Sequence, residues 1–422
     1  MKRVLVLAFV AMATVALSAQ NLGSQSTKPQ KFEGLAQTPP MGWNSWNTFG
    51  TNVTAQLVKE TADLFVKLGL KDAGYEYVVI DDGWMEMERD AETYLLVPHK
   101  EKFPQGMKEV ADYVHSKGLK LGIYNCAGIL TCAGYPGTRG YEFIDARQYA
   151  EWGIDYLKYD WCHTGESNGG LSYQQDARAS YTIMRDALYK AGRPILFSIC
   201  EWGDNQPWLW GEPVGHMWRV TGDIINCWDC ELNHGGWAQL GLWEVIRKRG
   251  DIRKYSGPGH WNDYDMLEVG NGFSPAEDRT HFTMWCMLAS PLMLGNDIRS
   301  MSKETLELIT NKELIAIDQD KLGIQGFRYL NDNGFEIWVK PLENEEWAVA
   351  FVNMTENPRQ LSYDWKKHPL QDILAGKYVD FNNTTYTLRD VFAKKAVGDT
   401  SKKLERVIEG HDVAVYRISQ KK

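Results

Sequence analysis

Seven carboxylic acids follow closely on apolar, strand-like stretches of the chain, where folding can bring them together. Their neighbours are Trp, Gly and Tyr rather than Lys and Ser, and solvation of exposed loops accounts for one or two of them but not readily for all. Two carboxyl groups in one pocket can hydrolyse a glycosidic bond, because one attacks the sugar while the other protonates the leaving oxygen. The seven are Asp81, Asp82, Asp160, Glu201, Asp223, Asp263 and Asp265.

Asp160 ends the stretch Tyr156–Asp160, which also contains Lys158. Residues two apart on a strand share a face, so the ammonium and the carboxylate are expected side by side inside a barrel. A nearby ammonium favours the ionised carboxylate, which is the state a nucleophile needs. A structural ion pair is the alternative. Because buried pairs are a weak source of stability, the functional interpretation is favoured.

Asp223 supplies the second carboxyl group. It follows the run Arg219-Val220-Thr221 through Gly222, so its side chain can turn over the end of the strand. In retaining glycosidases the two carboxyl groups lie about 5–5.5 Å apart, which leaves room for direct attack on the sugar. Taken alone, Asp223 could equally be a helix N-cap.

The elements that must position these groups alternate between strands and helices from Thr38 to about Ile317. Repeated strand–helix units of this length predict an α/β fold with a parallel sheet, and about eight of them predict a (β/α)8 TIM barrel over residues 37–324. The strand ends then form the mouth of the active site. The predicted strands are Tyr75–Ile80, Leu119–Tyr124, Ile154–Tyr159, Pro194–Ile199, His216–Thr221 and Met266–Val269, and the predicted helices are Ala55–Leu68, Gly106–His115 and Gln174–Lys190.

The pattern changes after Gln319-Asp320. Gly334–Val339, Trp347–Val352 and Asp412–Ile418 alternate as antiparallel strands. They predict a small C-terminal antiparallel β-sandwich over residues 325–422. No catalytic cluster stands out within it.

The first residues form an export signal. Lys2 and Arg3 precede an apolar run that ends at Ser18-Ala19, which predicts a signal peptide over residues 1–19 and a flexible lead-in over residues 20–36. The apolar run is too short to span a bilayer comfortably. We therefore expect an exported protein, periplasmic or extracellular, with no membrane partner.

Several classes of ligand are not expected. The formal net charge of −9 argues against a nucleic-acid partner. Cys227 and Cys230 form a CxxC motif, which is typical of redox and zinc sites. No second CxxC or HxxxH lies near it to complete a zinc site. No Gly-rich phosphate loop follows a first strand, so no nucleotide is expected. Glycoside hydrolysis needs only the two carboxyl groups, so no metal or cofactor is expected either. The sequence carries no signal for the oligomeric state.

Seven motifs in chain order resemble the signatures of glycoside hydrolase family 27, the α-galactosidases (melibiases) and their α-N-acetylgalactosaminidase relatives. The resemblance runs from about residue 37 to 325 and continues weakly through the C-terminal region. It implies a retaining, exo-acting enzyme that hydrolyses terminal α-linked galactose from an α-galactoside substrate without a cofactor. The motifs are Pro39–Asn47, Asp81–Trp84, Thr131–Gly137, Lys158–Asp160, Cys200–Gly203, Arg219–Asp223 and Gly257–Asp263.

The resemblance also implies a role for each matching residue. Asp160 corresponds to the nucleophile and Asp223 to the acid/base. Cys132 and Cys162 correspond to a disulfide at the rim of the pocket. The implied sugar-binding residues are Trp46, Asp81, Asp82, Tyr124, Lys158, Cys200, Glu201, Trp202, Arg219 and Asp265.

Specificity rests on two of these sites. In the family, bulky residues at Cys200-Glu201-Trp202 fill the space beside the sugar O2, so the resemblance implies a preference for galactose over N-acetylgalactosamine. Asp82 is expected to hold O6, which arabinopyranose lacks. A β-L-arabinopyranosidase, an α-N-acetylgalactosaminidase and a non-catalytic galactose-binding protein are the alternatives.

The sequence departs from the family at several points. Thr51 and Gly83 replace a pair of cysteines that form a disulfide in many relatives. Asn125-Cys126 stands where another polar pair is usual. Tyr264 stands where Pro is common, and its position next to Asp265 puts the accessory sugar preference in doubt.

Overall fold

The computed structural model describes residues 30–168, 171–249 and 252–421. The predicted signal peptide, residues 1–19, and the predicted lead-in as far as residue 29 lie outside the described residues. No helix in the described part of the chain has the length and apolarity needed to cross a membrane.

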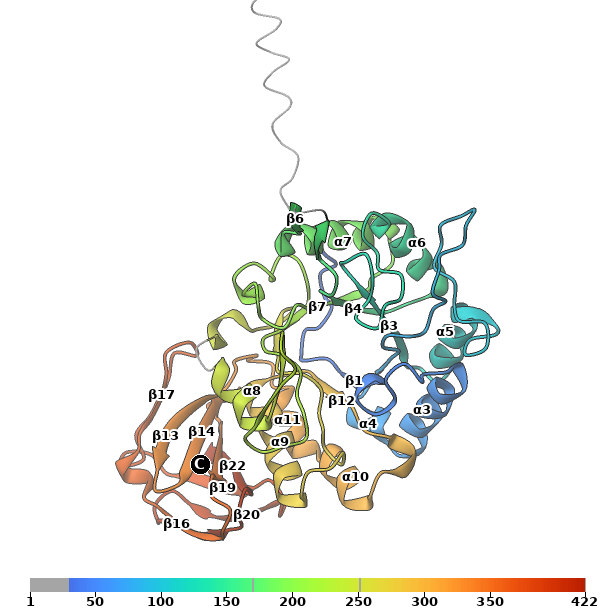
Figure 1. Ribbon diagram of the computed structural model, residues 1–422. Helices are drawn as coiled ribbons and strands as arrows, with labels where there is room; N and C mark the ends of the chain where they lie inside the picture. The colour runs from blue at the N-terminus through green and yellow to red at the C-terminus, as the bar shows by residue number, and fades with distance from the viewer. Residues whose placement is uncertain (1–29, 169–170, 250–251, 422) are drawn as a thin grey trace, which may run out of the picture. The chain divides into compact units, whose positions relative to one another are not determined.

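Eight parallel strands form one curled sheet, and helices pack outside it (Figure 1), so the predicted (β/α)8 barrel is confirmed. Their order is β11-β8-β7-β4-β3-β2-β1-β12, which is sequence order once the ring is closed. The strands are β1 (Met41–Asn44), β2 (Tyr77–Val79), β3 (Lys120–Cys126), β4 (Tyr156–Asp160), β7 (Leu196–Cys200), β8 (Met217–Arg219), β11 (Trp261–Asp263) and β12 (Leu292–Leu294).

The predicted strand at Met266–Val269 is wrong, and the seventh barrel strand is β11. Asp265 has a φ of 82°, in the left-handed region, which interrupts the extended chain. Beyond that break Leu267 closes the ring, because its N–H donates to Met293 O at 2.7 Å and its carbonyl accepts from Gly295 N at 3.0 Å. The apolar run in the sequence therefore marks the closure of the barrel rather than the strand itself.

The three predicted helices are confirmed as α3, α5 and α7. Thr54 caps the N-terminus of α3 by accepting from Leu57 N, and Asp176 caps α7 by accepting from Ala179 N. The helices are α2 (Trp46–Phe49), α3 (Ala55–Lys67), α4 (Leu70–Ala73), α5 (Gly106–Ser116), α6 (Glu142–Trp152), α7 (Ala177–Ala191), α8 (Leu242–Lys248), α9 (Pro275–Leu288), α10 (Lys303–Ile309) and α11 (Lys312–Asp318).

The C-terminal strands form a six-stranded antiparallel sheet in the order β13-β14-β15-β22-β19-β20, with the pairs β16-β21 and β17-β18 beside it. These strands confirm the predicted β-sandwich. They are β13 (Phe327–Asp332), β14 (Phe335–Pro341), β15 (Trp347–Asn353), β16 (Arg359–Tyr363), β17 (Leu370–Asp372), β18 (Lys377–Val379), β19 (Tyr386–Asp390), β20 (Lys395–Asp399), β21 (Leu404–Ile408) and β22 (Val413–Gln420).

Strand β15 shows how this sheet is covered on both faces. Val349 and Phe351 belong to the core of the C-terminal strands, whereas Ala348, Ala350 and Val352 join the core that contains the barrel helices. The alternation places successive side chains in different cores. Two short hairpins complete the fold, β5 (Gly165–Asn168) with β6 (Leu171–Gln174), and β9 (Glu231–Asn233) with β10 (Ala238–Leu240).

Candidate active site

The sugar-binding and acidic residues that the sequence singled out gather at the C-terminal ends of the barrel strands. Asp81 and Asp82 follow β2, and Asp160 is the last residue of β4. Arg219 ends β8, and Asp265 lies two residues beyond β11. All five are buried. In a barrel of this type the C-terminal strand ends are the place where chemistry is done.

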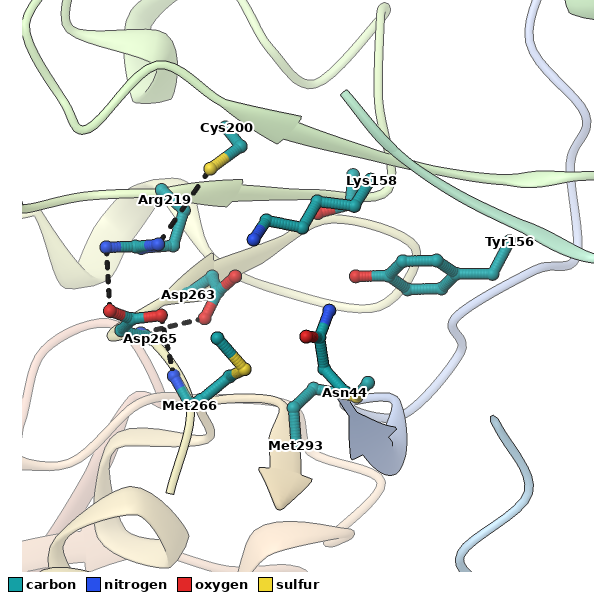
Figure 2. Close-up of a pocket in the computed structure, with 10 residues that line it drawn as sticks. Asn44, Tyr156, Lys158, Cys200, Arg219, Asp263, Asp265, Met266 and Met293 are labelled. Atoms are coloured by element: carbon teal, nitrogen blue, oxygen red, sulfur yellow. Dashed lines mark hydrogen bonds and ion pairs between the residues drawn. The ribbon is translucent and has the colours of Figure 1, made fainter. Parts of the chain in front are cut away.

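A small cavity lies among the strand ends (Figure 2), and of these five residues Arg219 and Asp265 line it, whereas Asp81, Asp82 and Asp160 do not. Lys158, Arg219, Asp263 and Asp265 are directed toward the same space in this view. The sequence interpretation had not assigned a binding role to Asn44 or Asp263, although both stand in the quoted motifs. Both residues could have been identified from the sequence by their positions, because each is the last residue of a barrel strand. The lining residues are Asn44, Tyr156, Lys158, Ser198, Cys200, Arg219, Asp263, Asp265, Met266 and Met293.

Lys158 bonds to Asp81 rather than to Asp160. Its ammonium lies 2.8 Å from Asp81 Oδ2, which also accepts from Asn44 Nδ2 at 2.8 Å. Burial acts to lower the pKa of Lys158, but the charges of Asp81 and Asp160 outweigh it and hold that pKa above its ordinary value. The cation therefore stays charged inside the barrel.

The expectation that Lys158 keeps Asp160 readily ionised needs correction. The pKa of Asp160 is raised to about 7, because burial raises it by more than Lys158 lowers it, and the charge of Asp223 acts in the same direction as burial. The physical reason is that removing the carboxylate from water outweighs a cation that is already paired with another carboxylate. A hydrogen bond from Trp161 N to Asp160 Oδ1, at 2.9 Å, orients the side chain.

Asp223 has a different environment. Its Oδ1 lies 2.9 Å from an Arg219 nitrogen, and the same guanidinium nitrogen lies 2.8 Å from Asp265 Oδ2. Asp265 also accepts from Ile224 N at 2.8 Å, which fixes the chain next to Asp223. The Asp223 side chain is 38% exposed, whereas those of Arg219 and Asp265 are each 4% exposed. Of the two carboxyl groups, Asp160 is thus enclosed and Asp223 is open to solvent.

Asp82 and Tyr124 contact the loop that contains Cys132 and Ala133. Asp82 Oδ2 accepts from Ala133 N at 2.9 Å, and burial raises the pKa of Asp82 to about 6. The Tyr124 hydroxyl lies 3.1 Å from Cys132 Sγ. Cys132 forms a disulfide with Cys162, as the resemblance implies. One oxygen of Asp160 lies within 4.8 Å of both sulfurs, so the disulfide borders the proposed nucleophile.

The three residues Cys200, Glu201 and Trp202, at the end of β7 and just after it, have different surroundings. Cys200 lines the cavity, and its sulfur is 3.8 Å from Arg219 Nη1. Glu201 is fully buried and does not line the cavity; its Oε2 accepts from the backbone and side chain of Asn205. Trp202 has a φ of 56° and is half-buried. Glu201 therefore supports the turn that carries Trp202.

Trp46 stands at the start of α2, next to the cavity residues. Its N–H donates to Asn44 Oδ1 at 2.8 Å, so the loop after β1 is bonded to the same Asn that bonds Asp81. Its half-buried indole packs against the cluster that contains Met266 and Met293. This position suits an aromatic wall of a sugar pocket.

The departures from the family have simple structural consequences. A Cβ on Gly83 would lie 2.7 Å from Thr51 Cβ, so the two positions that lack cysteine touch each other. Tyr264 is buried with its hydroxyl 3.2 Å from Arg249 O and 2.8 Å from Gln325 Nε2. Its side chain does not line the cavity, although its position next to Asp265 in the sequence had linked it to the sugar preference.

The CxxC motif is a disulfide. Cys227 and Cys230 are bonded to each other, and the free cysteines among the described residues, Cys126, Cys200 and Cys286, are buried. Disulfide-bonded sulfurs offer no thiolate to a zinc ion.

Comparison with known proteins identifies close relatives along the whole barrel and beyond it. A family described as "Alpha galactosidase A" matches residues 38–320, and one described as "Alpha galactosidase C-terminal beta sandwich domain" matches residues 332–418. Alpha-galactosidase A of Cellvibrio japonicus is 50% identical over 398 residues, which cover 94% of this chain and 96% of the relative. The alpha-galactosidase of Cyamopsis tetragonoloba is 42% identical, over 91% of this chain and 86% of the relative. The crystal structure of alpha-galactosidase I from Mortierella vinacea is 35% identical, with a TM-score of 0.82 over 91% of this chain and 98% of that one.

Proposed function

Because the chain belongs to the α-galactosidases of glycoside hydrolase family 27, we propose that it releases terminal α-linked galactose by double displacement, with Asp160 as nucleophile and Asp223 as acid/base. The observation that carries this assignment is the contrast between the two carboxyl groups. Asp160 is 5% exposed at the end of β4, whereas the Asp223 side chain is 38% exposed and bonded to Arg219. The enclosed group is placed to attack the sugar, and the more exposed group is placed to exchange protons with the leaving oxygen and with water.

In the first step, an Asp160 oxygen attacks the anomeric carbon while the bond to the leaving oxygen breaks. Asp223 gives its proton to that oxygen, so the leaving group departs as an alcohol. In the second step, water attacks the same carbon and gives a proton to Asp223, and the bond to Asp160 breaks. Two inversions at one carbon retain the α configuration, and both carboxyl groups return to their starting states.

The bonded charges around the cavity suit recognition of sugar hydroxyls. Asp81, Asp82 and Lys158 provide acceptors and donors for O3, O4 and O6, and Arg219 with Asp265 provides them for O2 and O3. Most of these groups are already bonded to one another, so they are oriented before the sugar arrives. The bulk of Trp202 disfavours an acetamide at O2.

The test compares rates on aryl α-galactoside, aryl α-N-acetylgalactosaminide and aryl β-L-arabinopyranoside. We expect galactoside to be the best substrate and α-galactose to be the first anomer seen by NMR. Asp160→Ala should lose several orders of magnitude in kcat, and azide or formate should partly rescue it by replacing the missing nucleophile. Full activity of Asp160→Ala, or initial release of β-galactose, would refute the proposed roles.

We also propose that residues 1–19 are removed on export and that the mature enzyme acts in the periplasm or outside the cell. The disulfides Cys132–Cys162 and Cys227–Cys230 support this, because such bonds persist in oxidising compartments. Mass spectrometry of the protein recovered from periplasm and medium should find Gln20 at the N-terminus. Recovery of an intact N-terminus from the cytoplasm alone would contradict it.

A further inference from the structure

An exposed tryptophan lies on the hairpin that follows Asp223. Trp237 is 55% exposed, and its indole stacks on the His234 ring with 4.2 Å between ring centroids and 20° between planes. Leu232 on the neighbouring strand is also exposed. The catalytic roles described above leave this hairpin, β9–β10, without a function.

The hairpin extends directly from the acid/base segment. Leu240 N donates to Asp223 O at 2.8 Å, and Ile225 N donates to Leu240 O at 2.9 Å. These two bonds make a parallel bridge between Ile224 and Leu240. The chain that carries Asp223 is therefore the third strand of a small sheet whose other two strands are β10 and β9.

The register of this sheet determines which side chains share a face. Ile224 and Leu240 are both buried, so the residues beside them, Asp223 and Gln239, project from the other face. Leu232 is opposite Gln239 in the hairpin, and His234 N donates to Trp237 O at 2.9 Å, which places these residues on that same face. The contact of 3.0 Å between His234 Nε2 and Gln239 Oε1 agrees with this. The exposed apolar face and the Asp223 carboxyl group thus point to one side.

The hairpin that carries this face is fixed at both of its ends. The disulfide between Cys227 and Cys230 lies just before β9, and Gly241 N, just after β10, donates to Cys230 O at 2.7 Å. A Cβ on Gly241 would lie 2.8 Å from Cys227 Sγ, so the two ends of the hairpin are packed together. A platform that is already ordered loses little entropy on binding a ligand.

We propose that this face, formed by Trp237, His234 and Leu232, binds the leaving-group saccharide of the substrate. The inference rests on the role of Asp223 proposed above, because the acid/base delimits the side on which the leaving oxygen departs. His234 covers one face of the indole, so the exposed half is the other face and the ring edge. A flat apolar ring face suits the C–H face of a pyranose, and the His and Gln polar atoms beside it suit its hydroxyls. The ligand is therefore a pyranose-containing oligosaccharide rather than a small alkyl or halide leaving group.

The test uses the ratio of kcat/KM on an α-galactosyl trisaccharide to kcat/KM on α-galactosyl fluoride, which has no leaving-group sugar. Contact with about half an indole is worth roughly one order of magnitude in binding, so Trp237→Ala should lower this ratio about tenfold, mainly through KM on the trisaccharide. Trp237→Phe, which keeps a flat apolar face, should recover part of the loss. The matched control is Tyr378→Ala, which removes a 63% exposed aromatic ring from the separate two-stranded sheet β17–β18 of the C-terminal region and should leave the ratio unchanged.

The outcomes separate the inference from the function on which it rests. An unchanged ratio in Trp237→Ala, or equal losses on both substrates, would overturn the leaving-group platform while the α-galactosidase assignment stood. A change of molecular mass by light scattering in Trp237→Ala with an unchanged ratio would assign the face to a second copy of the chain and also overturn it. A wild-type protein that turns over neither substrate would overturn the proposed function, and the platform with it.

Discussion

Replacing Lys158 by Met removes a cation that is bonded to Asp81 inside the barrel. The Lys158 side chain is 12% exposed and that of Asp81 is 2% exposed, so the carboxylate would be left buried with Asn44 as its remaining side-chain donor. Breaking a buried pair in this way costs about 3–5 kcal/mol, because the surviving charge is uncompensated. We expect the free energy of unfolding at pH 7 to fall by about that amount.

A matched control is available in the same barrel. Lys120 forms an ion pair with Glu76 at the same N–O distance, 2.8 Å, but the two side chains are 42% and 44% exposed. An exposed pair is worth about 0–1 kcal/mol, because water screens both charges. Lys120→Met should therefore change the free energy of unfolding by no more than about 1 kcal/mol. The contrast between the two variants isolates the effect of burial.

The assays are urea denaturation at pH 7 and the pH profile of kcat/KM on α-galactosyl fluoride. Since Lys158 lowers the pKa of Asp160, its loss should move the acid limb of the profile to higher pH. Equal destabilisation by Lys158→Met and Lys120→Met, or an acid limb that stays in place, would refute this account of the cavity.

Four further outcomes follow from the structure. The wild-type kcat/KM should rise with pH through about 7, because the nucleophile must be ionised and the pKa of Asp160 is raised to about 7; a profile that is flat from pH 5 to 8 would contradict this. Asp160→Asn should be inactive yet more stable than the wild type at pH 8 by about 1–4 kcal/mol, because a carboxyl group whose folded pKa is raised costs stability as the pH rises above its unfolded value; calorimetry at pH 5 and pH 8 measures the difference. Cys132→Ser with Cys162→Ser should lower the free energy of unfolding by about 3.6 kcal/mol, from a sequence separation of 30, and a variant as stable as the wild type in urea would argue against a structural role for that disulfide. Asp82→Ala should lower the ratio of kcat/KM on galactoside to that on β-L-arabinopyranoside, and an unchanged ratio would mean that Asp82 does not contact O6.

Local chemistry made most of the fold predictable. Thr54 and Asp176 cap the helices they precede, and the spacing of Leu57, Val58, Ala62 and Phe65 gives α3 one buried face. The seventh barrel strand was not predicted because β11 is Trp-Asn-Asp, in which only the Trp has the apolar character expected of a strand. Its two polar side chains have partners from other parts of the chain: Asp263 accepts from Asp265 N and is near the Arg219 charge, and Asn262 bonds to Trp218 Nε1 and Gln325 Oε1.

Residues close together in the chain were enough to predict the alternation of strands and helices, the barrel strands β2, β3, β4, β7 and β8, the acidic residues at the strand ends and the seven motifs of the family. They did not predict β1, β11 or β12. The ion pairs between these charged side chains depend on the tertiary structure. Lys158 is two residues from Asp160 in sequence but bonds to Asp81, which is 77 residues away, and Arg219 joins Asp223 to Asp265. The pKa values of these groups depend on burial and on partners from other strands, and neither quantity exists until the ring of strands has closed.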